Sequence, residues 1–109
     1  MRIERYGIYW VDLNPVMGAE IAKVRPAVIV SDDLMNTHLQ TVVVCPLTSK
    51  LHPGWRSRIG IHCAGIASEI AVDQIRTISK MRLKSSLDKL NDSTAKELRD
   101  LIIEMYGTA

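Results

Sequence analysis

Short apolar runs separated by Gly, Pro, Asn and Ser dominate the chain up to about residue 78. Runs of about four to eight residues bounded by such turn formers are typical of β-strands. We expect six strands, at residues 7–13, 27–30, 41–47, 58–61, 69–72 and 74–78. The runs at 27–30 and 42–45 contain no polar residue, which predicts strands that are buried on both sides or bent around a closed core.

The apolar pattern changes to a helical period near the end of the chain. Apolar residues recur there at i, i+3, i+4 and i+7: Leu98, Leu101, Ile102 and Met105. Asn91 is a suitable N-cap, and Gly107 stands where helices often end, so we expect one amphipathic C-terminal helix. A short helical turn is also plausible at residues 32–35, after Ser31.

The order of these elements predicts a small fold that is mainly β with a C-terminal helix. A strongly bent antiparallel barrel suits several short strands, because closure removes exposed strand edges. The 109 residues contain no repeat, low-complexity tract or linker. We therefore expect a single domain spanning residues 1–109.

Charge is distributed unevenly along the chain. The formal net charge is only +2, which argues against a protein that coats nucleic acid without selectivity. Residues 50–84, however, contain seven basic and two acidic residues, a net of +5. Either this segment forms one basic face, or its charges are simply part of a solvated surface.

The sequence has no pattern typical of a metal site, a signal peptide or a membrane segment. Cys45 and Cys63 have no partner at zinc-ligand spacing, so we expect no metal and no other cofactor. No signal-peptide pattern or membrane-length apolar stretch is present. We expect a cytoplasmic protein with both thiols reduced and no membrane association.

The segment 14–24, between the first two expected strands, is longer than a simple turn and ends at Arg25-Pro26. Proline favours an extended conformation for the residue before it. Arg25 at the mouth of a strand would offer a permanent positive charge and a planar set of donors, which suits a phosphate. The alternative is a structural ion pair with Glu20.

Two further segments place polar groups beside buried strands. The third expected strand ends at Thr48-Ser49, whose hydroxyls are either simple caps or, together with Arg25, part of a metal-free phosphate site. Asp73 and Gln74 interrupt an apolar stretch, so one must face inward or the strand must break. The Gln74 amide could bind a base edge or tie down a neighbouring loop.

These residues lie in stretches that resemble the MazF/PemK-like toxins of bacterial toxin–antitoxin systems. The matching stretches occur in the family's order, at residues 7–15, 18–20, 25–31, 42–49 and 72–78, followed by Lys80 and Leu83. The resemblance implies an SH3-like or plasmid-toxin barrel that works as a homodimer. It also implies metal-independent cleavage of single-stranded RNA through attack by the ribose 2′-hydroxyl, which leaves 2′,3′-cyclic phosphate and 5′-hydroxyl ends.

The resemblance also implies roles for individual residues. Arg25 resembles the family's main catalytic arginine, and Thr48 its phosphate-contacting partner. Four further positions resemble substrate contacts: Glu20, Ser49, Asp73 and Gln74. A family member would also have a cognate antitoxin whose acidic, disordered C-terminal segment covers the substrate groove.

Three departures from the family pattern limit these expectations. Ala19 stands where some relatives carry Ser, and Ala71 where another branch has a catalytic arginine. Residues 52–56 match no family pattern, so the recognised RNA sequence is not predicted. Two alternatives of other classes stay open: a non-enzymatic toxin of the same barrel fold that poisons DNA gyrase, and an SH3-like peptide-binding module.

Overall fold

The structure, a computed structural model, describes residues 2–107. This part of the chain forms seven strands, two α-helices and two 3-10 turns. The strands are β1 (Gly7–Asp12), β2 (Val24–Ile29), β3 (Thr41–Thr48), β4 (Arg58–Cys63), β5 (Ile66–Ala71), β6 (Arg76–Ser79) and β7 (Leu83–Lys89). The helices are α1 (Asp33–His38) and α2 (Asp92–Tyr106), and the 3-10 turns are η1 (Val72–Gln74) and η2 (Lys80–Arg82).

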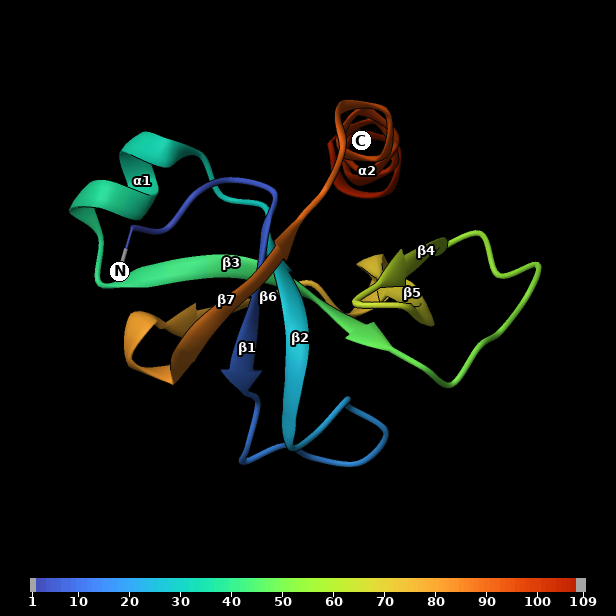
Figure 1. Ribbon diagram of the computed structural model, residues 1–109, viewed down its shortest axis with the longest axis horizontal. Coiled ribbons are helices and arrows are strands. Elements are labelled where there is room, and N and C mark those ends of the chain that lie inside the picture. The colour runs from blue at the N-terminus through green and yellow to red at the C-terminus, as the bar shows by residue number, and fades with distance from the viewer. Residues whose placement is uncertain (1, 108–109) are drawn as a thin grey trace.

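The strands form one strongly bent antiparallel sheet with the order β4-β5-β3-β2-β1-β7. β3 is its central strand: its first half pairs with β6, its last residues pair with β5, and its other edge pairs with β2. The end of β3 therefore lies between the β1–β2 loop and the β3–β4 loop, which project from the lower and right sides of the molecule in Figure 1.

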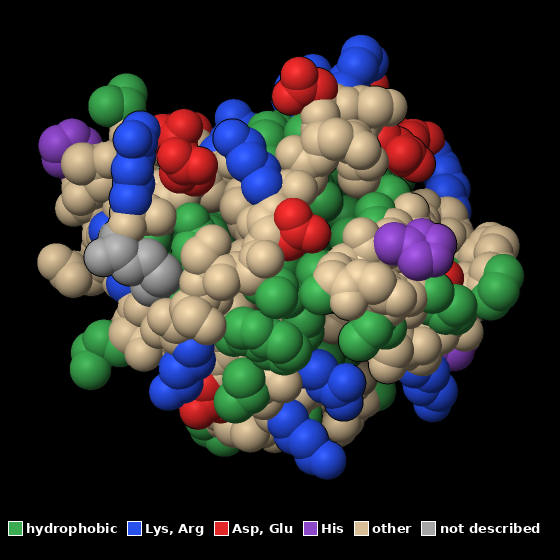
Figure 2. Space-filling model, viewed as in Figure 1, with side chains coloured by type: hydrophobic (Ala, Val, Ile, Leu, Met, Phe, Trp, Pro, Cys, Tyr) green, Lys and Arg blue, Asp and Glu red, His purple; other side chains and the backbone are tan. Residues whose placement is uncertain are grey.

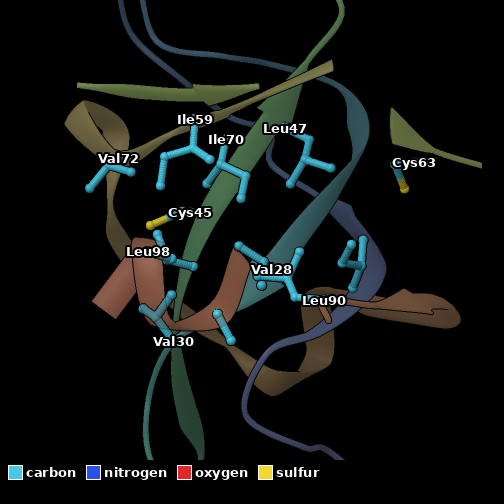
Figure 3. Packing of buried hydrophobic residues seen from close by; sticks show 12 residues of the cluster. Val28, Val30, Cys45, Leu47, Ile59, Cys63, Ile70, Val72, Leu90 and Leu98 are labelled. Atoms are coloured by element: carbon cyan, nitrogen blue, oxygen red, sulfur yellow. The ribbon is translucent and has the colours of Figure 1, made fainter. Parts of the chain in front are cut away.

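Both faces of the sheet are buried, because alternate residues of β2 and β3 enter different hydrophobic clusters. Val28 and Cys45 belong to the cluster that α2 covers, whereas Ala27 and Val44 belong to the cluster on the opposite face. Figure 3 shows Cys45 next to Leu98 of α2. The expectation that these continuous apolar runs are buried on both sides is confirmed.

Both helices begin at a capping side chain, and α2 also ends where its sequence predicts. The Asn91 side chain accepts a hydrogen bond from the Thr94 amide, and the Gly107 amide closes the helix on the Ile103 carbonyl. Asp32 caps α1 in the same way through the Met35 amide, although α1 extends to His38 rather than to residue 35. The predicted barrel with a C-terminal helix is thus the fold observed.

Three expectations about the strands were wrong. β2 starts at Val24, earlier than predicted, because Asp12 pairs with Val24 and prolongs the β1–β2 hairpin. Gln74 lies in η1 and not in a strand, so the apolar stretch breaks at Asp73 and Gln74 instead of turning one of them into the core. β7, which pairs with β1, was not expected, because its residues are mostly polar and exposed.

Candidate functional site

Thr48, the last residue of β3, forms the shared wall of two pockets. The first pocket has a volume of about 210 Å³, and the walls around Thr48 are Arg25, Ser49, Trp10, Leu47 and Ile66. The second has a volume of about 360 Å³, and its walls include Lys50, His52, Trp55, Arg58, Asp73 and Gln74. We call them the Arg25 pocket and the Arg58 pocket.

Arg25 and Thr48 come together through the pairing of their strands. Ala27 of β2 is opposite Pro46 of β3, and continuing this antiparallel register by two residues brings Arg25 opposite Thr48. Residues paired in this way project from the same face of a sheet. The structure therefore places together the two residues that the sequence selected as a phosphate site.

The polar groups of this pair are only partly used within the protein. Arg25 donates from Nε to the Ala22 carbonyl at 3.2 Å. Its predicted alternative partner, Glu20, instead accepts from the Met17 amide at 2.7 Å, and no carboxylate among residues 2–107 forms an ion pair with Arg25. Thr48 Oγ1 accepts from the Lys50 amide at 3.1 Å, so its proton is left to donate.

The positive charge of Arg58, by contrast, is offset by two carboxylates. Its side chain is only 6% exposed, and it lies 2.8 Å from Asp73 Oδ1 and 3.5 Å from Glu69 Oε1. Its guanidinium carbon also lies 4.8 Å from the centre of the Trp55 ring. Two acidic groups thus offset the charge of Arg58, and Lys50 is a second cation that lines the Arg58 pocket.

The ionisation of Asp73 reflects this contact. Burial raises the pKa of its carboxyl, but hydrogen bonds from Arg58 and Ser57 outweigh burial, and the pKa lies below the ordinary value. Asp73 is therefore held in its charged form beside Arg58.

Gln74 connects the Arg58 pocket to the β1–β2 loop. Its side-chain oxygen accepts from the Ile21 amide at 2.7 Å, so it ties down the loop, one of the two roles expected from the sequence. Its amide nitrogen remains available as a donor. Glu20, in the same loop, lines neither pocket, so the structure does not bring it together with Arg25 and Thr48.

The basic segment 50–84 does not form one positively charged face. Arg76 and Arg82 donate to the carbonyls of Leu13 and Asp12 at the base of the β1–β2 loop, and Arg58 is buried in ion pairs. On the face drawn in Figure 2, basic side chains lie at several separate places, beside acidic side chains in the upper part and beside hydrophobic ones in the lower part. The hypothesis of a shared basic face was wrong, because three of its arginines stabilise loops.

Sequence reasoning found Thr48, Asp73 and Gln74 but missed the aromatic pair of the Arg58 pocket and the carboxylate that supports it. His52 and Trp55 form a stacked pair, and Glu69 is a buried carboxylate at 7% exposure. The unmatched segment 52–56 was the one available signal. Nothing in the spacing showed that a glutamate on β5 would support it, because that contact depends on the β4–β5 register.

Other groups that could carry chemistry are scarce in the described structure. Between residues 2 and 107, no cluster of three or more His, Cys, Asp or Glu side chains is arranged to hold a metal ion. Cys45 and Cys63 are free thiols. Burial, aided by the charge of Asp73, raises the pKa of Cys45 to about 12, which leaves it protonated and unreactive. No helix in this range is long and apolar enough to cross a membrane.

Comparison with known proteins identifies the family. The model of the family described as PemK-like, MazF-like toxin of type II toxin-antitoxin system matches residues 4–106. The chain belongs to this toxin family. A curated relative, Endoribonuclease MazF of Staphylococcus saprophyticus, is 33% identical over 108 residues, which cover 92% of this chain and 88% of the relative. The resemblance stated from the sequence is thereby confirmed.

Solved structures of MazF toxins share the fold. The crystal structure of MazF from Deinococcus radiodurans has a TM-score of 0.86 at 20% identity and covers 99% of both chains. A chain of the MazE-MazF structure (Form-II) from the same organism has a TM-score of 0.81 at 20% identity, over 100% of this chain and 99% of that one. These likenesses confirm the small toxin barrel.

Proposed function

We propose that this chain is a single-domain, sequence-selective endoribonuclease that cleaves single-stranded RNA without a metal ion, as the toxin of a toxin–antitoxin pair. Family membership and the curated relative named Endoribonuclease MazF support this enzyme class. The observation that carries the proposal is the uncompensated guanidinium of Arg25 opposite the Thr48 hydroxyl in one pocket. No observation favours the alternative of a gyrase poison.

RNA supplies its own nucleophile in this reaction. The ribose 2′-oxygen attacks the adjacent phosphorus and loses its proton, the bond from phosphorus to the 5′-oxygen breaks, and the leaving oxygen takes up a proton. The products are a 2′,3′-cyclic phosphate and a 5′-hydroxyl end. The protein has to orient the phosphate and stabilise the negative charge that grows on its oxygens.

Arg25 and Thr48 suit these two tasks. The terminal guanidinium nitrogens of Arg25 supply a fixed positive charge and two donors to phosphate oxygens. Thr48 adds one hydroxyl donor from the opposite strand. Because the pKa of arginine lies above about 12, Arg25 acts as an electrostatic clamp rather than as a general base.

Four other residues are proposed to contact the RNA. Ser49 lines the Arg25 pocket and extends the row of hydroxyls beyond Thr48. Asp73 and Gln74 line the Arg58 pocket, where the Asp73 oxygen that Arg58 does not contact and the amide nitrogen of Gln74 can reach base edges. Glu20 is exposed on the β1–β2 loop, and its second carboxylate oxygen is available to an approaching base.

The proposal includes a homodimer, a cognate antitoxin with an acidic, disordered C-terminal segment, and a cytoplasmic location. Exposed apolar side chains at the mouth of the Arg25 pocket (Trp10, Val24 and Ile66) would be covered by a second copy of the chain. Antitoxin binding is supported by related structures, among them the MazE-MazF structure and an endoribonuclease in complex with its cognate antitoxin from Mycobacterial species.

The test is cleavage of a long single-stranded RNA by the purified protein in EDTA, with the ends mapped by primer extension. We expect cleavage at a short recurring sequence and 5′-hydroxyl ends. Arg25→Ala should lower the rate by about 10²- to 10³-fold or more, because a donor to the transition-state charge is lost. Arg25→Lys should recover only part, since a lysine offers no planar pair of donors.

A second test uses Thr48→Val, which keeps the shape of the side chain and removes its hydroxyl. Thr48→Ser, which keeps the hydroxyl, is the matched control. Thr48→Ser should stay close to wild type and Thr48→Val should not. The proposed function is wrong if the wild type leaves RNA intact in EDTA, or if Arg25→Ala cleaves at the wild-type rate.

A further inference from the structure

Two aromatic rings stand in the loop that follows Thr48. The rings of His52 and Trp55 are parallel within 11°, with centres 3.9 Å apart. Trp55 is 49% exposed, so a large aromatic surface faces solvent in the Arg58 pocket, within the same pocket as Thr48. Large exposed aromatic surfaces beside polar groups commonly mark binding sites.

The protein holds these rings in place before any ligand arrives. The buried carboxylate of Glu69 accepts from the His52 amide at 3.0 and 3.1 Å, and it also contacts Arg58. Arg58 in turn lies over Trp55 and is fixed by Asp73. One buried carboxylate thus supports both sides of the aromatic pair, which lowers the entropy that binding would otherwise cost.

The charge beside the rings favours an uncharged ligand group. Arg58, which lies over Trp55, is offset by Glu69 and Asp73, so it is not available to a phosphate. Lys50, the other cation that lines the pocket, is exposed to solvent. Arg25, in the neighbouring pocket, forms no ion pair with a carboxylate among residues 2–107. A strand of RNA that placed its scissile phosphate between Arg25 and Thr48 would bring a flanking nucleotide to His52 and Trp55, where a planar base can stack.

We propose that the His52–Trp55 pair is the platform on which one nucleobase flanking the scissile phosphate stacks, and that Arg58 and Glu69 are its positioning residues. This inference rests on the proposed function. Asp73 and Gln74, at the edge of the same pocket, supply an acceptor and a donor to the edge of that base. The platform thereby contributes to the choice of RNA sequence as well as to affinity.

The experiment uses the full chain and a short oligoribonucleotide centred on the cleavage site mapped on the long RNA. A single 2′-deoxy residue at the cleaved position removes the nucleophile, so that Kd can be measured by fluorescence anisotropy without cleavage. A series of such oligonucleotides lacks one base at a time. We expect one flanking position at which loss of the base weakens wild-type binding by about 5- to 150-fold.

The variants are Trp55→Ala, Trp55→Phe and His52→Ala, each checked for folding by circular dichroism. Trp55→Ala should bind the intact oligonucleotide more weakly by the same factor and should be insensitive to loss of that one base. Trp55→Phe retains a ring and should stay close to wild type, and His52→Ala should lie between them. Leu51→Ala, an exposed residue of the same loop that lines neither pocket, is the matched control and should not change Kd.

The proposal is wrong if loss of a base weakens RNA binding by Trp55→Ala as much as it weakens binding by the wild type at every position. It is also wrong if Trp55→Ala leaves RNA binding unchanged and instead weakens self-association or binding of a protein partner. If the wild type cleaves no RNA, the proposed function fails separately. The comparison of Trp55→Ala with Leu51→Ala on single-stranded homo-oligoribonucleotides then still decides whether the rings bind bases.

Discussion

Two arginines lie on opposite sides of Thr48, and their surroundings differ. Arg25 is partly buried, gives one hydrogen bond to a backbone carbonyl, and pairs with no carboxylate among residues 2–107. Arg58 is almost fully buried and contacts two carboxylates and an indole ring. Arg25 is therefore available to bind an anionic ligand in its pocket, whereas the charge of Arg58 is already neutralised by contacts within the protein.

This difference separates two requirements of an RNA-cleaving site. Charge on a phosphate has to be met by a cation that is not already neutralised, which Arg25 provides. A base has to be met by a rigid, uncharged surface such as the His52–Trp55 rings, which Arg58 can support because its own charge is already offset by Glu69 and Asp73. The positions of the carboxylates explain this difference: they pair with Arg58 and fix it in place, and they leave the charge of Arg25 unpaired.

The largest effect is expected from Arg58→Met. Removing the cation leaves the Glu69 carboxylate buried without a partner, so the free energy of unfolding should fall by about 3–5 kcal/mol in urea titrations. Arg25→Ala should cost no more than about 1.5 kcal/mol, the value of one hydrogen bond. Arg58→Met combined with Glu69→Gln should recover part of the loss, and a loss below about 1 kcal/mol in Arg58→Met alone would contradict a structural role for this arginine.

A smaller effect is expected from Gln74→Leu, which breaks the link between the two sides. Gln74 holds the Ile21 amide, and the next carbonyl, that of Ala22, holds Arg25 Nε. Loss of the first bond should cost about 0.5–1.5 kcal/mol of stability and lower the cleavage rate by about 2- to 10-fold. Faster hydrogen exchange of the Ile21 amide checks the cause. Gln74→Glu keeps the acceptor oxygen, so an unprotected Ile21 amide in that variant would contradict the assignment.

The smallest effect concerns acid stability. Because the pKa of Asp73 is lower in the folded protein than in the unfolded chain, its pair with Arg58 stabilises the protein above about pH 4, and this contribution disappears as the pH falls through the folded value. Asp73→Asn should therefore reduce stability at pH 7 by less than about 1 kcal/mol, since Asp73 is partly solvated. The difference from wild type should vanish at low pH, and a difference that grows there would refute the pairing.

Several site residues could be predicted from the sequence, because the signals that mark them lie in short stretches of neighbouring residues. Arg25 before a proline and Thr48 at the end of an apolar run were visible as candidates, and the strand register then set them opposite each other. Gln74 was ambiguous between base and loop, and only the position of the Ile21 amide, 53 residues away, showed that it holds the loop. β7 was missed because a polar edge strand has no apolar signature of its own.

The barrel, the terminal helix with its Asn91 cap, and the family could all be predicted from the amino-acid sequence, since periodicity, capping and motif order are properties of neighbouring residues. Which charges remain unpaired could not be predicted, because it depends on contacts between distant segments. Three arginines contribute to the net charge of the basic segment in the sequence: Arg58, Arg76 and Arg82. In the structure, however, they form ion pairs or hydrogen bonds with carboxylates and carbonyls of other segments. Arg25 forms no ion pair with any carboxylate in the described range 2–107, and proximity of that kind depends on three-dimensional packing.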